Sequence, residues 1–117
     1  MAERRRVAIT EDGSVTLVRF VDRKIIDAAN IQEMGEELFA LLDEDNRKQL
    51  LLSFANVEFL SSAALNKLIV LDRKIKAVGG RLALSNLRPE IQEVFAITRL
   101  NQLFDIKPNE AEALKMF

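Results

Sequence analysis

Residues 56–78 read NVEFLSSAALNKLIVLDRKIKAV, and this stretch decides the fold of the chain. It begins as a short strand that ends in a turn and continues as an amphipathic helix. Apolar residues recur at the spacing that keeps one face of a helix against a core, at Ala64, Leu68, Leu71, Ile75 and Val78. Ser61 and Ser62 stand directly ahead, where the N-cap of this helix belongs. An anion, including a covalently attached phosphate, is favoured at such a helix N-terminus.

Residues 59–65, FLSSAAL, resemble the phosphorylation loop of STAS domains, the family that includes the anti-sigma factor antagonists. In that family a strand ends in Asp-Ser-Ser-Gly or Asp-Ser-Thr-Gly, and a helix follows. This chain carries Leu60 where the family usually has Asp and Ala63 where it usually has Gly. The specific motif is short, but the resemblance spans nearly the whole chain. It implies a STAS fold, and the two departures bear on the implied phosphorylation rather than on the fold.

The composition indicates one globular domain without the residues of common enzyme chemistry. The 117 residues are 49% hydrophobic and 30% charged, and their formal net charge of −1 offers no broad basic surface for a nucleic acid. The chain contains no cysteine and no histidine. Thiol chemistry, the commonest metal ligand and the usual general base near neutral pH are therefore missing. We expect no enzymatic activity, no metal and no cofactor.

The chain also shows no pattern for a membrane or for secretion. No apolar run approaches the roughly 20 residues of a membrane-spanning helix, and the N-terminus lacks the apolar core of a signal peptide. A cytoplasmic location fits these features and the absence of cysteine. We assign residues 1–6, which end in three arginines, to a basic N-terminal tail and residues 7–117 to the domain.

Strand and helix patterns alternate along the domain. An Asp12-Gly13 turn is expected to join two strands into a hairpin. Further short strands are expected at 24–26, 49–54, 81–85 and 103–106. Asn30 is the expected N-cap of the first helix, with Glu33 closing a capping box. Pro89 and Asn109 are expected at the starts of the last two helices.

This order of elements predicts an α/β fold. The opening hairpin makes the sheet mixed, and the later alternation of helix and strand indicates parallel strands joined by right-handed crossovers. We therefore predict a single STAS-like domain in which a small mixed β-sheet with parallel strands is covered by about four helices.

The serine pair is the candidate modification site. A purely structural role is open to both hydroxyls, because serine is a preferred N-cap and its neighbour can simply fill the turn. The resemblance implies that a partner kinase phosphorylates Ser61, and Ser62 is the alternative. A phosphate adds a charge of roughly −1.5 to −2, which a helix N-terminus tolerates. Modification would therefore change the surface of the domain rather than its fold.

A protein-docking face is expected beside the serines. The side chains that point away from the apolar stripe of the helix are Ser62, Ala63, Asn66, Val70 and Arg73. Small apolar and polar side chains together suit a modest docking patch, although an exposed valine is normal on any protein surface. This face is the candidate partner-binding site.

Two polar residues outside this helix are candidates for the same site. The resemblance implies an aspartate near the phosphorylated serine, at the start of the loop before the first helix. Asp27 matches that position best and Asp22 competes with it, while a solvated loop carboxylate is the alternative interpretation. Asn56 could close the same surface.

The resemblance implies an anti-sigma factor antagonist that acts in bacterial partner switching. Unmodified, it would bind an anti-sigma factor that is also a serine kinase; phosphorylated on Ser61, it would release that partner. The alternative is a non-phosphorylated STAS scaffold subunit of a larger signalling complex, which Leu60 and Ala63 would favour. Both interpretations predict a protein partner, with no nucleic acid and no membrane, and both leave the oligomeric state open.

Overall fold

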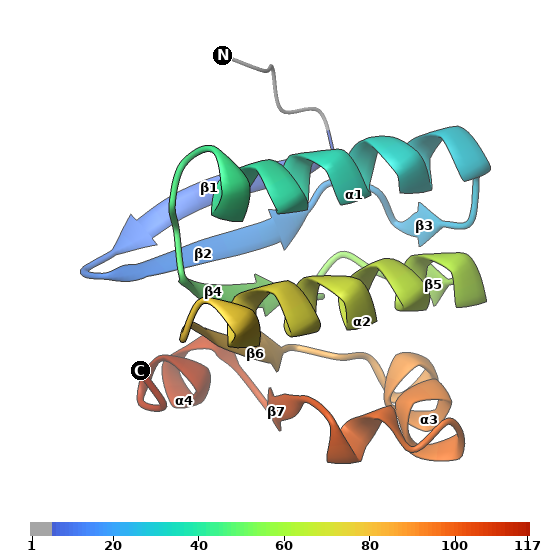
Figure 1. The fold of residues 1–117 in the computed structure, drawn as a ribbon. Helices are drawn as coiled ribbons and strands as arrows, with labels where there is room; N and C mark the ends of the chain where they lie inside the picture. The colour runs from blue at the N-terminus through green and yellow to red at the C-terminus, as the bar shows by residue number, and fades with distance from the viewer. Residues whose placement is uncertain (1–5) are drawn as a thin grey trace.

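A five-stranded sheet forms the centre of the computed structural model, which describes residues 6–117 (Figure 1). In their spatial order the strands are β1 (Val7–Asp12), β2 (Val15–Phe20), β4 (Gln49–Ser53), β6 (Arg81–Ser85) and β7 (Asp105–Lys107). β1 pairs antiparallel with β2, and every other neighbouring pair is parallel. The predicted mixed sheet is confirmed.

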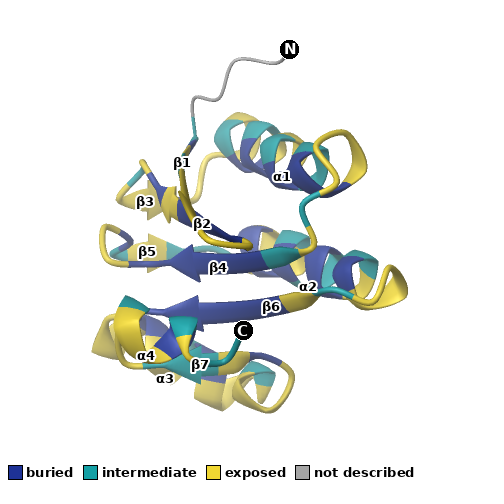
Figure 2. Cartoon of the chain, turned by 90° about the vertical axis from the view of Figure 1, so that its left-hand side faces the viewer, coloured by how far each residue is buried: buried dark blue, intermediate teal, exposed yellow. Residues whose placement is uncertain are grey.

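Helices make the long connections that parallel strands require. α1 (Ala28–Asp43) and α2 (Ser62–Ala77) lie side by side on one face of the sheet, and the short α4 (Glu110–Leu114) lies on the other face (Figures 1 and 2). α3 (Pro89–Ile97) and the 3-10 turn η1 (Leu100–Gln102) connect β6 to β7. The predicted single α/β domain with about four helices is therefore confirmed.

Two separate apolar clusters hold these layers together. The larger cluster lies between the sheet and the helices α1, α2 and α3, and it includes the completely buried Leu38, Leu52 and Leu68. The smaller cluster lies beneath α4 and consists of Val15, Leu17, Leu51, Ala83 and Ala113. Successive residues of a strand point to opposite faces, so Leu50 and Leu52 of β4 belong to the larger cluster and Leu51 belongs to the smaller one.

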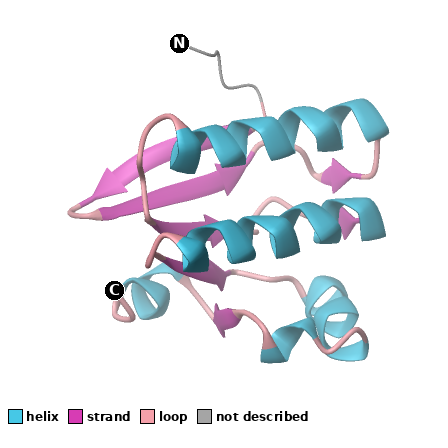
Figure 3. Cartoon of the chain, in the orientation of Figure 1, coloured by secondary structure: helices cyan, strands magenta, loops and turns pink. Residues whose placement is uncertain are grey.

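A second sheet of two short strands lies where α1 and α2 begin (Figure 3). β3 (Lys24–Ile25) pairs in parallel with β5 (Phe59–Leu60), with Ile25 opposite Leu60. The N–H of Ser61 donates to the carbonyl of Ile25 at 3.0 Å. This small sheet ties the N-terminal ends of α1 and α2 to each other.

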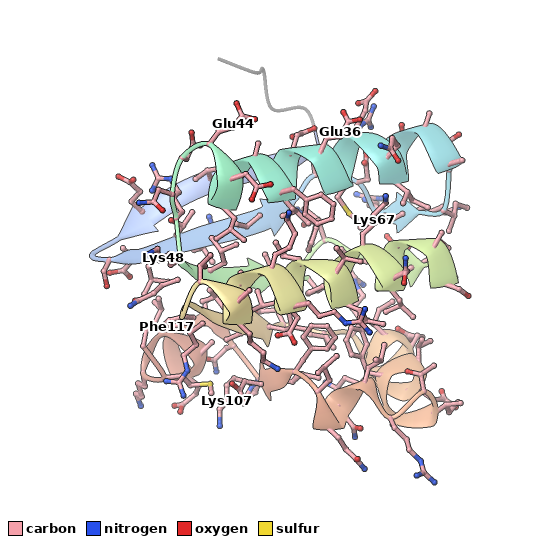
Figure 4. The ribbon with its side chains drawn as sticks, in the orientation of Figure 1. Glu36, Glu44, Lys48, Lys67, Lys107 and Phe117 are labelled. Atoms are coloured by element: carbon pink, nitrogen blue, oxygen red, sulfur yellow. The ribbon has the colours of Figure 1, made fainter. Side chains whose placement is uncertain are left out.

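α1 and α2 pack closely because glycine faces lysine where they meet. Gly35 of α1 is buried, and a Cβ atom at this position would lie 3.0 Å from Cδ of Lys67. Lys67 extends between the two helices, and its Nζ donates to Gln32 at 3.4 Å, whereas Glu36 and Glu44 lie on the outer side of α1 (Figure 4). The aliphatic stem of Lys67 therefore fills the space that Gly35 leaves.

The predicted start of the first helix is wrong. The N-cap of α1 is Asp27 rather than Asn30, and the Asp27 carboxylate accepts hydrogen bonds from the N–H groups of Ala29 at 2.9 Å and Asn30 at 3.2 Å. β3 ends at Ile25, so the helix can begin directly afterwards. Glu33 therefore closes no capping box and instead forms an ion pair with Arg6 at 3.0 Å.

Two further predictions fail at the ends of elements. Val78, expected in the buried stripe of α2, is 44% exposed because it is the C-cap residue, after which the chain turns at Gly79 with a φ of +74°. The last strand covers Asp105–Lys107 rather than 103–106. Leu103 instead closes η1, since its N–H donates to the carbonyl of Leu100 at 3.0 Å.

The remaining helix starts are confirmed. Ser61 caps α2, Pro89 is the first residue of α3, and Asn109 caps α4 by accepting from the N–H of Glu112 at 2.9 Å. Most of the predicted basic tail, residues 1–5, lies outside the described residues. Arg6, its last member, contacts the domain through Glu33 and through Asp22 at 3.2 Å.

Candidate functional site

Ser61 is fixed between β5 and α2. Its backbone is extended, with φ −79° and ψ 166°, and its Oγ accepts a hydrogen bond from the N–H of Ala64 at 3.3 Å. Its own N–H is bonded to Ile25 of the neighbouring strand. The residue is half-buried. The chain therefore holds this hydroxyl in a defined position at the N-terminus of α2.

Ser62 and Ala63 are the first two residues of α2, and both are exposed. Within residues 6–117 the hydroxyl of Ser62 makes no hydrogen bond, in contrast to that of Ser61. Ala63 has helical backbone angles, so this position does not need the left-handed conformation that favours glycine. The alanine that replaces the usual glycine of the motif is therefore compatible with the turn.

Asp27 follows β3, the strand that pairs with β5 directly ahead of the serine turn. Ile25 is opposite Leu60, so the residues that follow these two strands continue next to one another into α1 and α2. Asp27 is exposed and caps α1, as Ser61 caps α2. The two helix N-termini consequently lie at one edge of the molecule (Figure 1).

The other two polar candidates have contacts of their own. Asp22 pairs with Arg6 at 3.2 Å, which makes it part of the contact between the chain ahead of β1 and the β2–β3 loop. Asn56, in the turn after β4, is exposed, and its Nδ2 donates to the carbonyl of Phe20 at 3.3 Å. Asn56 therefore joins this turn to the end of β2.

The outer face of α2 has the predicted orientation. Ser62, Ala63, Asn66 and Arg73 are exposed, and Val70 is half-buried. The opposite side of the helix contacts the larger cluster through Ala64, Leu68, Leu71 and Ile75, which are all completely buried. The structure thus brings Ser62, Ala63, Asn66, Val70 and Arg73 together on one accessible face that begins at the serine turn.

Sequence reasoning missed an apolar rim around this turn, formed by Ile26 and Phe59. Ile26 and Phe59 are 57% and 53% exposed. Val21, in the loop before β3, is also 53% exposed but is not counted in this rim. Nζ of Lys24 lies 5.6 Å from the centre of the Phe59 ring. Ile26 follows Ile25 and Phe59 precedes Leu60, and strand alternation allows only one residue of each pair to face the core. That pattern could have revealed the rim.

Residues 6–117 contain neither a metal-binding cluster nor a membrane-spanning helix. No three or more acidic side chains in this part of the chain are arranged to hold a metal ion. None of the helices described there has the length and apolar character needed to cross a membrane.

A family model described as STAS domain matches residues 6–113, which is nearly the whole chain. The chain belongs to the STAS domain family. In this STAS domain the serine turn joins β5 to α2. Leu60, at the usual aspartate position, is half-buried and packs against the larger cluster. The side chain at that position therefore contributes to packing.

Individual relatives agree with this assignment. A candidate anti-sigma factor antagonist of Bordetella bronchiseptica, BtrV, is 27% identical over 93 residues, which cover 80% of this chain and 79% of BtrV. An anti-sigma-factor antagonist (STAS) domain protein from Planctomyces limnophilus is 21% identical, with a TM-score of 0.81 over 94% of this chain and 95% of that one. The phosphorylated form of SpoIIAA from Bacillus has a TM-score of 0.70 at 17% identity, over 94% of this chain and 97% of SpoIIAA. The two structural likenesses show the fold.

Proposed function

We propose that this STAS domain is an anti-sigma factor antagonist that binds an anti-sigma factor with serine kinase activity and is regulated by phosphorylation of Ser61. The observation that carries the proposal is the position of Ser61. Ser61 is a half-buried residue at the N-terminus of α2, between the short strand that carries Phe59 and the exposed residues Ser62 and Ala63. The similarity to BtrV supports the class of partner.

A phosphate on Ser61 would be compatible with the fold. The first N–H groups of a helix have no acceptor within the helix, and they favour an anion together with the positive end of the helix dipole. Ser62 and Ala63 supply such N–H groups next to Ser61. The modification would therefore leave α2 intact and change the charge of the surface around it.

The proposed docking surface surrounds that charge. It consists of the apolar rim together with Asp27, Asn56, Ser62, Ala63, Asn66, Val70 and Arg73. A partner that covers Ile26 and Phe59 removes water from the neighbouring serine as well. A phosphate of about −2 charge would have to be desolvated in the same contact, which opposes binding.

In this function the protein is the substrate of a kinase and a binding module rather than an enzyme. The partner binds ATP, so the antagonist needs no catalytic residue and no cofactor of its own. Partner switching acts on the transcription machinery, which places the protein in the cytoplasm.

Binding to the cognate anti-sigma factor kinase, measured by titration calorimetry, tests the proposal. Ser61→Asp should weaken binding at least tenfold, which is about 1.4 kcal/mol. Ser61→Ala should retain binding but take up no phosphate from kinase and ATP. Ser14→Ala, in the turn between β1 and β2 and outside the docking surface, is the control and should keep both properties. Unchanged binding of Ser61→Asp, or phosphate on Ser62 alone, would contradict the assignment of Ser61.

A second candidate function is a constitutive STAS scaffold in a larger signalling complex. The observation that favours it is Leu60, an apolar residue packed against the core at the position where the family motif has a carboxylate. A scaffold would show no phosphate on Ser61 or Ser62 in its own cells, and neither Ser61→Ala nor Ser61→Asp would alter its binding. Phosphosite mapping under growth and stress separates the two functions.

A further inference from the structure

A row of four polar residues crosses the sheet on the face opposite α1 and α2. Arg19 of β2 is opposite Ser53 of β4, Ser53 is opposite Ser85 of β6, and Ser85 is opposite Lys107 of β7. The row lies at the carboxyl ends of parallel strands, the edge at which open α/β sheets bind ligands. Two hydroxyls thus stand between two cationic side chains.

The two serines are buried without normal hydrogen bonds. Ser53 and Ser85 are 1% and 0% exposed; the Ser53 hydroxyl is near enough to Glu110 to stabilise its carboxylate but makes no hydrogen bond of good geometry, and Ser85 Oγ has no partner within the described chain. Most buried hydroxyls have a partner, because an unpaired polar group in the interior is unfavourable. This part of the sheet has more hydrogen-bonding capacity than the protein itself uses.

A carboxylate from α4 already occupies one end of the row. Glu110 accepts hydrogen bonds from Nη2 of Arg19 at 2.8 Å and from Nε at 3.2 Å, in the two-point geometry with which arginine holds an oxyanion. The Arg19 guanidinium, with the Ser53 hydroxyl nearby, holds the pKa of Glu110 below its usual range. Glu110 therefore shows directly that this end of the row binds an oxyanion.

A second cationic side chain, that of Lys107, lies at the other end of the row. Lys107 is half-buried and forms no ion pair within residues 6–117. It also lines a cavity of about 700 Å³ between α3 and β7, whose walls include Phe95 and Ile106. Phe95 and Ile106 belong to the larger cluster on the opposite face of the sheet, so this cavity adjoins the row only at Lys107.

We propose that Arg19, Ser53, Ser85 and Lys107 form a binding site for a small oxyanion, a carboxylate or a phosphate, and that Glu110 occupies it as an internal ligand. An external anion would take the place of the Glu110 carboxylate on Arg19 and satisfy the buried hydroxyls. α4 is suited to yield, because it has only five residues and covers the small cluster rather than the main core. Leu114, Met116 and Phe117 also pack against this cluster, and Arg81 donates a hydrogen bond to the carbonyl of Met116.

Chemical rescue of Glu110→Ala tests this proposal. The variant removes the carboxylate and leaves its space beside Arg19. We expect formate or phosphate to raise the melting temperature of the variant by about 3 °C relative to chloride at the same ionic strength. Stabilisation by formate alone would indicate a space the size of a carboxylate, and stabilisation by phosphate as well would indicate a larger space. Both outcomes support the site. The amide resonances of Ser53 and Ser85 should shift on titration.

Glu112→Ala is the matched control, because Glu112 lies on the same helix and pairs at 3.2 Å with Lys115 rather than with the row. It should show no rescue, and Arg19→Gln combined with Glu110→Ala should abolish it. Equal stabilisation of all variants, or none in Glu110→Ala, would overturn the proposal. Should Glu110→Ala be largely unfolded, the same titration is made with Glu110→Ser, which also leaves the space of the carboxylate and should show the same rescue.

Discussion

The hydroxyl of Ser61 has a structural role that does not depend on any phosphate. It satisfies the N–H of Ala64 in the first turn of α2, whereas the neighbouring Ser62 hydroxyl makes no such bond within the described chain. Loss of a serine N-cap costs about 1 kcal/mol of stability. The two serines can therefore be distinguished by stability before any partner is known.

We expect Ser61→Ala to lower the free energy of unfolding by about 1 kcal/mol and Ser62→Ala to change it by less than about 0.5 kcal/mol. Ser61→Asp should be close to the wild type, because aspartate is also a good cap and its charge suits the helix N-terminus. Urea denaturation followed by circular dichroism measures all three. Equal losses in the two alanine variants would argue against the observed cap.

Asp27 shows where residue-level sequence reasoning reached its limit. The resemblance predicts Asp27 as a site residue, but the sequence pattern predicts Asn30 as the N-cap of the helix. Aspartate and asparagine both cap helices, and Glu33 lies three residues beyond Asn30. The choice between them depends on where β3 ends, which in turn depends on pairing with β5. That pairing joins segments about 35 residues apart and leaves no local signal.

At the scale of elements, the start of β6 depends on a close approach of two backbones. A Cβ atom on Gly80 would lie 2.3 Å from the carbonyl oxygen of Lys48, and the next N–H, that of Arg81, donates to the same oxygen at 2.8 Å. Only glycine allows this contact without movement of the strand. The junction between α2 and β6 is therefore sensitive to the smallest added side chain.

Gly80→Ala should destabilise the domain by about 1–3 kcal/mol, because the backbone at Lys48 or Gly80 must shift. Gly79→Asn is the control: Gly79 has a φ of +74° but no neighbour within 4 Å of an added Cβ, and asparagine tolerates the left-handed conformation. Its effect should be within about 1 kcal/mol. Chemical denaturation gives the free energy of unfolding of both variants. A smaller loss for Gly80→Ala than for Gly79→Asn would contradict the close contact between Gly80 and Lys48.

Most elements could be predicted because their patterns are long and periodic. The stripe from Ala64 to Ile75 and the run in β4 lie as expected, since local spacing and burial agree. The failures are at ends. Val78 continues the spacing but follows the last helical residue, and Leu103, the first residue of the predicted strand, instead closes η1. Apolar spacing alone does not show where hydrogen bonding stops.

At the scale of the whole molecule, the attachment of α4 to the sheet predicts a pH dependence of stability. Arg19 lowers the pKa of Glu110 relative to its value in the unfolded chain, about 4.5. A carboxyl whose folded pKa is depressed contributes stability above the unfolded pKa, and the contribution is lost as the pH falls through the folded value. The ion pair should therefore stabilise the domain at pH 7 and not in strong acid.

Glu110→Gln should be less stable than the wild type by up to about 1 kcal/mol at pH 7, and the difference should shrink steadily below about pH 4.5. Glu112→Gln should show a smaller difference, because Glu112 and its partner Lys115 are more exposed. Urea unfolding at several pH values provides the measurement. A constant difference between wild type and Glu110→Gln across this range would show that the charge on Glu110 does not contribute.

The arrangement of the whole sheet also explains what local patterns could not provide. Arg19, Ser53, Ser85 and Lys107 come from four separate strands, and only the order β2-β4-β6-β7 places them in one row. The serine turn, by contrast, lies within a single short segment. Candidate residues that are contiguous in the sequence can be recognised in the chain itself. Residues that come together only across a sheet can be recognised only once the order of the strands is known.

The small sheet of β3 and β5 has a consequence for the thermodynamics of binding. Backbone hydrogen bonds from Ser61 to Ile25 and from Phe59 to Arg23 hold the serine turn before any partner arrives. The conformational entropy of ordering this segment is therefore lost during folding and not during association. A partner meets a preorganised surface, and the affinity of the complex reflects contacts and desolvation instead of a disorder-to-order transition.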